Sequence, residues 1–171
     1  MFATIYLPNF YLQSAMRHQS ELRAKPVALL DDKDKRAVII QLNQVAEEAG
    51  VRKGMTPSHG LARCLSLIIK TRARSQEKSI DDIVLHYAFT LAPYVEATAP
   101  GVCTIQFTDN RDLNPKVSRV IAQLAEYEIT AQAGIASTPD ASLLVAHLAH
   151  SVLQIEHAKE FLAPLRIETL A

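Results

Sequence analysis

The stretch of the chain that decides its fold runs from residue 79 to residue 136 and reads SIDDIVLHYAFTLAPYVEATAPGVCTIQFTDNRDLNPKVSRVIAQLAEYEITAQAGIA. Its first part repeats apolar residues at helical spacing, and strand-like runs and turn residues follow. The predicted elements, in order, are a helix from Ser79 with Asp82 in a capping box, strands at 94–97 and 102–108 around Pro100-Gly101, a helix capped by Asn114-Pro115, and a strand at 130–136.

The N-terminal residues complete this pattern. A β-rich run at 2–7 is stopped by Pro8, and a helix is predicted at 10–17. The combined order is close to β-α-β-β-α-β, which predicts an α/β (α+β) fold with a ferredoxin-like sheet and helices on one face. The strand at 2–7 and the helix from Ser79 are separated by an insertion, so we predict a sheet domain of residues 1–20 and 79–171 and an inserted domain of residues 21–78.

Both the insertion and the C-terminal part hold further elements. A charged turn between two apolar runs in the insertion predicts a hairpin, and the last residues predict a short helix followed by an extended segment. The remaining predicted elements are strands at 25–30, 36–40 and 67–71, helices at 43–49 and 56–64, and a helix from Thr138-Pro139 to about His150.

Composition narrows the class of function. The 171 residues hold 18 Lys and Arg against 18 Asp and Glu, and zero formal charge argues against strong autonomous binding of nucleic acid. A local basic strip is still open, and the candidate contacts to a DNA backbone are Arg52, Lys53, Lys70, Arg72 and Arg74. No apolar run is long enough for a bilayer, no signal peptide opens the chain, and two cysteines suit the cytoplasm.

Three groups of polar residues invite a metal interpretation that the sequence does not favour. Asp31, Asp32 and Asp34 alternate with basic residues in the predicted hairpin turn, where a solvated polar turn is the better interpretation. Asp81 and Asp82 begin a helix, where the helix dipole favours negative charge. His147 and His150 lie three residues apart without an evident third ligand, so we predict no metal and no cofactor.

An ordered set of segments over essentially the whole chain resembles one family. It includes the aromatic pair Phe10-Tyr11, the segments 36–43, 50–55 and 61–70, Gly134-Ile135-Ala136 before a helix, and the segment 161–165. Together they resemble the palm and fingers of the Y-family (DinB/UmuC-like) translesion DNA polymerases. The resemblance implies an N-terminal palm and fingers region, with thumb and later parts outside this sequence.

Family catalysis uses carboxylates that hold two metal ions. The resemblance places these carboxylate positions at Tyr6, Pro8, Gly101 and Val102 of this chain. Two magnesium ions demand hard oxygen ligands that these four side chains do not offer. The resemblance therefore implies a chain without catalytic residues.

The triphosphate site is altered in the same way. The fingers tyrosine of the family falls on Gln44, and its fingers arginine falls on Glu47, which reverses the charge that faces a triphosphate. The aromatic residue that screens the sugar survives as Tyr11, and the later phosphate-contacting lysine falls near Pro139. Tyr11, Gln44 and Glu47 would then form a degenerate nucleotide pocket.

This pattern resembles the ImuB-like mutagenesis accessory proteins, whose first strand also ends in Leu-Pro, as Leu7-Pro8 does here. The implied role is a non-catalytic accessory or scaffold in SOS mutagenesis and translesion repair. Its partners would be a repair polymerase and the sliding clamp, bound through parts partly outside this chain, with weak DNA contact. Two alternatives remain open: an active nucleotidyltransferase that uses displaced acids such as Glu96 or Asp109, and a ferredoxin-like regulatory scaffold unrelated to DNA.

Overall fold

The computed structural model describes residues 1–31 and 37–165, and the chain forms two compact units. The sheet unit consists of Met1–Pro8 and Asp81–Ala171, and the inserted unit consists of Asn9–Ile80. This division falls after Pro8 rather than after residue 20, because helix α1 (Phe10–Met16) packs against strands of the inserted unit. The domain boundary predicted at residue 20 therefore differs from the one between the compact units.

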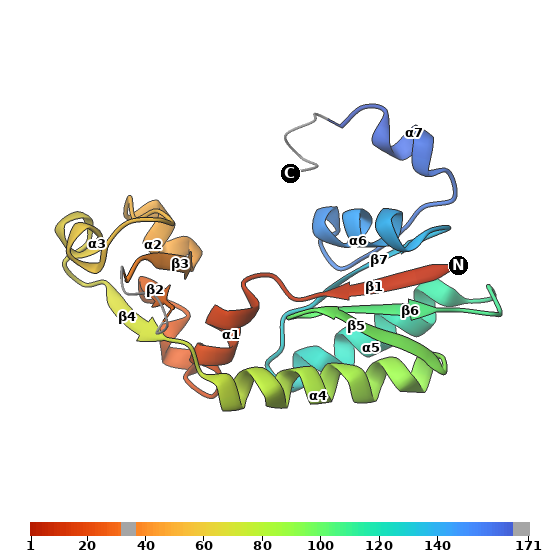
Figure 1. The fold of residues 1–171 in the computed structure, drawn as a ribbon, viewed down its shortest axis with the longest axis horizontal. Coiled ribbons are helices and arrows are strands. Elements are labelled where there is room, and N and C mark those ends of the chain that lie inside the picture. Colours follow the sequence, from red (N-terminus) through yellow and green to blue (C-terminus); the bar gives the residue numbers. More distant parts are fainter. Residues whose placement is uncertain (32–36, 166–171) are drawn as a thin grey trace. The chain divides into compact units, whose positions relative to one another are not determined.

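The sheet unit is built on a five-stranded sheet in the order β5-β6-β1-β7-β8 (Figure 1). Strand β1 lies in the middle, antiparallel to both β6 and β7, so the ferredoxin-like order of strands is confirmed. The edge strand β8, parallel to β7, was not predicted from the sequence. The strands are β1 (Phe2–Tyr6), β5 (Tyr94–Ala99), β6 (Val102–Gln106), β7 (Gln132–Ala136) and β8 (Val152–Gln154).

The two helices of the ferredoxin-like core, α4 (Arg74–Leu91) and α5 (Leu113–Glu126), cover one face of this sheet, as expected (Figure 1). The amphipathic face predicted for α5 is confirmed, because five of its apolar side chains are buried at helical spacing. Each such side chain contributes roughly 1.5–3 kcal/mol relative to an exposed one. These buried residues are Leu113, Val117, Val120, Ile121 and Leu124.

Helix α6 (Pro139–Leu148) packs on the opposite face of the sheet. A methyl group on Gly134 of β7 would lie only 2.2 Å from the carbonyl oxygen of Ser142 in α6, so the glycine permits this close approach. The hydroxyl of Ser142 also lies 2.7 Å from the hydroxyl of Thr4 in the neighbouring β1. The short helix α7 (Ala158–Leu162) follows β8.

Two helix starts were predicted wrongly. Helix α4 begins at Arg74, five residues before Ser79, because Glu77 of its first turn is buried and pairs with Arg72. Ser79 does not cap the helix, and its hydroxyl accepts a hydrogen bond from Arg17 at 3.0 Å. Helix α5 begins at Leu113, so Asn114 lies inside the first turn rather than at the cap.

The inserted unit holds a three-stranded sheet in the order β3-β2-β4. The antiparallel pairing of β2 with β3 confirms the predicted hairpin, whose turn at 32–36, with Asp32 and Asp34, lies outside the described residues. Asn43 and Thr56 cap the two following helices through their side chains. The elements are β2 (Val27–Leu30), β3 (Ile39–Leu42), β4 (Ile68–Thr71), α2 (Gln44–Glu48), α3 (Pro57–Arg63) and the 3-10 turn Ser20–Leu22.

Two separate apolar clusters cover the two faces of this small sheet. Val27 and Leu29 of β2 pack with Leu12 and Ala15 of α1. Ala28, which alternates with them, packs with residues of β3, α2 and the loop after α2. Helix α1 and helix α2 therefore lie on opposite faces of the β3-β2-β4 sheet.

Candidate functional site

The end of β1 lies directly beside the start of β6. Tyr6 is the register partner of Val102, and the amide of Leu7 donates a hydrogen bond to the carbonyl oxygen of Gly101 at 2.9 Å. The structure thus brings three of the positions that the resemblance marks as carboxylate positions, Tyr6, Gly101 and Val102, to one end of two neighbouring strands. Pro8 follows two residues after Tyr6.

An aromatic contact occupies this end of the sheet. The ring of Tyr6 lies on the imidazole of His147 in α6, with ring centroids 4.0 Å apart and planes inclined by 30°. Partial burial raises the pKa of Tyr6 and lowers the pKa of His147. Both shifts favour the neutral forms near pH 7, so the contact offers no anionic oxygen to a cation.

The residues at this end do not fit the two metal ions that catalysis in the resembling polymerases uses. A phenol, an imidazole, an imino acid and a valine supply neither the charge nor the hard oxygen set that the ions require. Gly101 has a φ of 71°, so an aspartate introduced there would also be strained. Among the described residues, no three His, Cys, Asp or Glu side chains form a group that could hold a metal ion.

The two displaced acids of the nucleotidyltransferase alternative lie elsewhere in the sheet unit. Glu96 of β5 is the register partner of Thr104, two residues along β6 from Val102. Asp109 lies three residues beyond Gln106, the last residue of β6, and so follows the end of that strand opposite to Val102. Asp109 is paired with Arg111, which lowers the pKa of this carboxyl to about 2. Neither acid therefore occupies one of the four carboxylate positions of the family, and the two lie toward different ends of β6.

The residues of the predicted nucleotide pocket are not brought together by any described contact. Tyr11 belongs to α1 and packs with the apolar cluster on one face of the small sheet. Gln44 and Glu47 belong to α2, on the other face, and both are exposed. The Gln44 amide donates to the Glu48 carboxylate at 2.7 Å, which holds it along its own helix.

The ring of Tyr11 is covered by Arg72. The guanidinium carbon of Arg72 lies 3.8 Å from the centroid of the Tyr11 ring, a cation–π contact. The same guanidinium donates from Nε to Glu77 Oε1 at 3.0 Å and from Nη2 to Glu77 Oε2 at 2.6 Å, and it lies 3.9 Å from Asp31. The hydrogen bonds to Glu77 raise the pKa of Arg72 further above its usual value. Arg72, a predicted contact to a DNA backbone, therefore has its guanidinium held by residues of the inserted unit.

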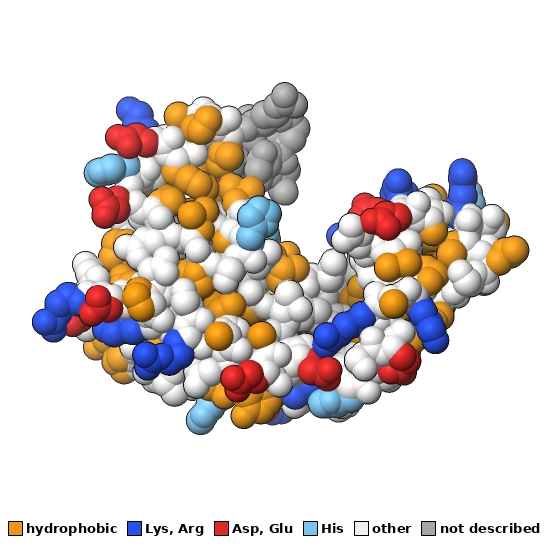
Figure 2. Space-filling model, turned by 180° about the vertical axis from the view of Figure 1, so that it is seen from behind, with side chains coloured by type: hydrophobic (Ala, Val, Ile, Leu, Met, Phe, Trp, Pro, Cys, Tyr) orange, Lys and Arg blue, Asp and Glu red, His pale blue; other side chains and the backbone are white. Residues whose placement is uncertain are grey.

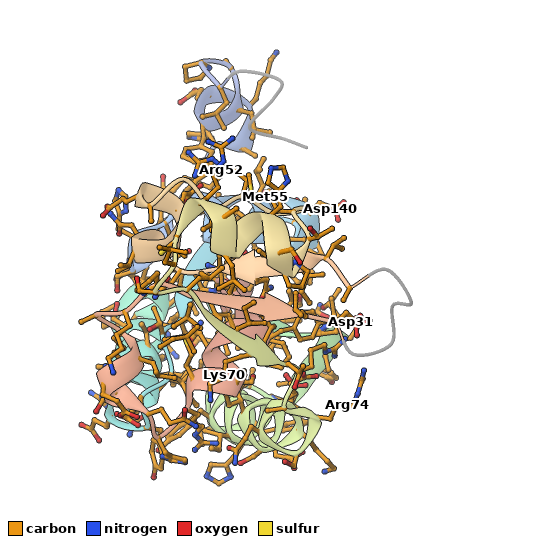
Figure 3. All side chains as sticks on the ribbon, turned by 90° about the vertical axis from the view of Figure 1, so that its left-hand side faces the viewer. Asp31, Arg52, Met55, Lys70, Arg74 and Asp140 are labelled. Carbon is orange, nitrogen blue, oxygen red and sulfur yellow. The ribbon has the colours of Figure 1, made fainter. Side chains whose placement is uncertain are left out.

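The other candidate DNA contacts divide between the two faces of the small sheet (Figure 3). Lys70 lies on the α1 side and donates to the Gln19 side chain at 2.6 Å, and Arg74 lies 3.9 Å from Asp31. Arg52 lies beside α2 and donates to the backbone carbonyl oxygens of Glu47 and Val51, as a C-terminal cap. Lys53, next to it, is exposed. The five residues thus do not form one continuous strip.

Sequence reasoning missed two site features. In the sequence, His147 stands out only through its spacing from His150, and nothing in that spacing shows that α6 lies over the end of β1. The sequence does hint at the pairing of Arg72 with Glu77, because residues of opposite charge five apart across the start of a helix can meet.

None of the helices in the described part of the chain is both long and apolar enough to cross a bilayer.

A ferredoxin-like sheet with an early α/β insertion defines the palm and fingers of a Y-family DNA-polymerase-like domain. The model of the impB/mucB/samB family matches residues 5–147, and the chain belongs to this family. It is similar to DNA polymerase IV of Shewanella pealeana, with 28% identity over 132 residues that cover 74% of this chain and 37% of that protein.

Solved structures agree on the fold. DinB from Sulfolobus solfataricus superposes with a TM-score of 0.83 at 15% identity, over 98% of this chain and 52% of that one. A post-insertion binary complex of Dbh DNA polymerase gives a TM-score of 0.85, also at 15% identity and over the same shares. The chain spans about half the length of these structures and about a third of the polymerase from Shewanella.

Proposed function

We propose that this chain is a catalytically inactive Y-family module of the ImuB-like branch, which acts in translesion DNA repair as an accessory or scaffold. The observation that carries the proposal is the stacked pair of Tyr6 and His147 at the end of β1, beside Val102. Nucleotidyl transfer needs converging carboxylates at this place, and a neutral aromatic pair supplies none.

Features of the inserted unit support the same proposal. The ring of Tyr11 is engaged by Arg72, and Glu47 is the residue that faces solvent at the position of the family's fingers arginine. A carboxylate there repels a triphosphate. We further propose that a repair polymerase and the sliding clamp are its partners, bound partly through segments outside this chain, in a cytoplasmic setting that suits the free thiols of Cys64 and Cys103.

Primer extension tests the proposal directly. The protein is incubated with a primed template, four deoxynucleotides and either Mg²⁺ or Mn²⁺, and we expect no extension above a control without protein. A variant with the pair Tyr6→Asp and Val102→Glu should also stay inactive, because Gln44 and Glu47 still occupy the triphosphate side. Metal-dependent extension by the unmodified chain that is lost in Glu96→Gln would instead establish the nucleotidyltransferase with displaced acids.

A further inference from the structure

The zero formal charge of the chain is the sum of two opposite charges. The inserted unit, residues 9–80, contains thirteen Lys and Arg against seven Asp and Glu, a formal charge of +6. The sheet unit, residues 1–8 and 81–171, contains five against eleven, a formal charge of −6. Figure 2 shows Lys and Arg side chains standing out from the surface of the inserted unit. The inserted unit should therefore attract negatively charged partners and the sheet unit positively charged ones, although the whole chain is neutral.

The acidic sheet unit has an open hollow of about 290 Å³ on the α6 side of its sheet. Side chains from β1, β5 and β6 line it, and the first residue of α6 closes one side. Its lining residues include no Lys or Arg, and the carboxylate of Glu96 is the charged group among them. The side chains that matter for binding are Phe2, Tyr94, Glu96, Thr98, Thr104 and Gln106.

These groups suit a cation and disfavour a phosphate. The Tyr94 side chain is 60% exposed at the rim, so its ring face can accept an ammonium or guanidinium group. Glu96, two residues along the same strand, points to the same side of the sheet and adds an ion-pair partner. A nucleic-acid backbone would instead meet a carboxylate within a unit of net charge −6 and no neutralising side chain in the hollow.

The exposed edge of the sheet favours a ligand in an extended conformation. Strand β5 is the outermost strand next to the hollow, and five of its six residues are exposed. Its outer backbone amides and carbonyls can pair with an added strand, a common mode of peptide recognition. A segment on this edge would present alternate side chains over Tyr94 and Glu96.

We propose that this hollow and the β5 edge bind an extended, Lys- or Arg-bearing segment of a partner protein. The segment adds a strand to β5 and places a cationic side chain between the ring of Tyr94 and the carboxylate of Glu96. The proposal stands on charge and shape, and it holds whether or not the chain is a polymerase.

Fluorescence anisotropy with the whole protein tests this surface. The probe is a labelled, end-blocked peptide of alternating Arg and Val, titrated at low salt. Glu96→Gln and Tyr94→Ala should each weaken binding roughly twofold to fivefold, as expected for an exposed ion pair and a cation–π contact. Glu126→Gln, an equal change of charge on the exposed end of α5, is the matched control and should bind like the unmodified chain.

Two further titrations separate the sources of binding. The same peptide with citrulline in place of Arg should bind more weakly to the unmodified chain and show no difference between the variants. Equal weakening by Glu126→Gln and Glu96→Gln would overturn the proposal, because it would reduce the interaction to general charge attraction. Binding of a single-stranded oligonucleotide that is lost in Tyr94→Ala, with unchanged peptide binding, would assign the hollow to nucleic acid and also overturn it.

Discussion

The buried ion pair between Arg72 and Glu77 gives the sharpest prediction for the inserted unit. Glu77 is 8% exposed, and both of its oxygens accept from the Arg72 guanidinium. Removing one partner of a buried pair typically costs 3–5 kcal/mol. Glu77→Gln keeps the shape and one acceptor, and Asp31 lies 3.9 Å away. We therefore expect a loss below that range, about 2–3 kcal/mol, because the arginine keeps some compensation.

The measurement must report the inserted unit by itself, since two units need not unfold together. Hydrogen exchange in increasing urea, read on the amides of β2, β3 and β4, provides this. With a urea dependence of about 2 kcal/mol/M, the variant should lower the midpoint for these amides by about 1–1.5 M. The double variant Arg72→Met with Glu77→Met should recover most of the loss, because no charge is then left buried and unpaired.

An exposed pair of similar geometry is the control. Asp109 and Arg111 are held at 2.8 Å on the surface of the sheet unit, and Asp109→Asn should leave every midpoint unchanged. If Glu77→Gln leaves the exchange of the inserted unit unchanged while Arg72→Ala weakens DNA binding, the reasoning is refuted. Arg72 would then be a phosphate contact, as the sequence first suggested.

Three further predictions concern the sheet unit. Gly134→Ala should destabilise it by more than about 3 kcal/mol in thermal unfolding, since the added methyl meets the backbone of α6. The free energy of unfolding of the sheet unit should fall as pH drops below about 6.5, because the pKa of His147 is lowered in the folded protein and the unfolded chain binds the proton more readily. The variant His147→Phe keeps a ring against Tyr6 and should flatten this pH dependence. Burial raises the pKa of Cys103 to about 12, so iodoacetamide should label Cys64 well before Cys103 in the folded protein, and equal rates would contradict the buried position.

Much of the fold could be predicted because local signals and topology agree. The strand alternation around Pro100-Gly101, the apolar face of α5 and the capping residues Asn43 and Thr56 each mark an element that the structure confirms. The start of α4 was missed because residues 74–78 are polar and carry no apolar repeat. The burial of Glu77 against Arg72 fixes that first turn, and this burial is a tertiary effect.

The location of the candidate site could be predicted from sequence, but the side-chain contacts within it could not. The pairing of Tyr6 with Val102 follows from the order of strands, so the end of β1 could be located from sequence. The contact of Tyr6 with His147 depends on α6 crossing above β1, which no local pattern encodes. The opposite charges of the two units are already present at the boundaries predicted from sequence, because residues 21–78 hold twelve Lys and Arg against seven Asp and Glu.

The end of β1 should not hold divalent cations, and Mn²⁺ binding measures this most directly. Electron paramagnetic resonance of free Mn²⁺, titrated with the protein and a deoxynucleoside triphosphate, counts any ions that the protein sequesters. We predict the same free Mn²⁺ with and without protein, and no difference between the unmodified chain and Tyr6→Phe. A stoichiometric, saturable Mn²⁺ site that broadens the signals of His147 or Val102 in nuclear magnetic resonance would contradict the account.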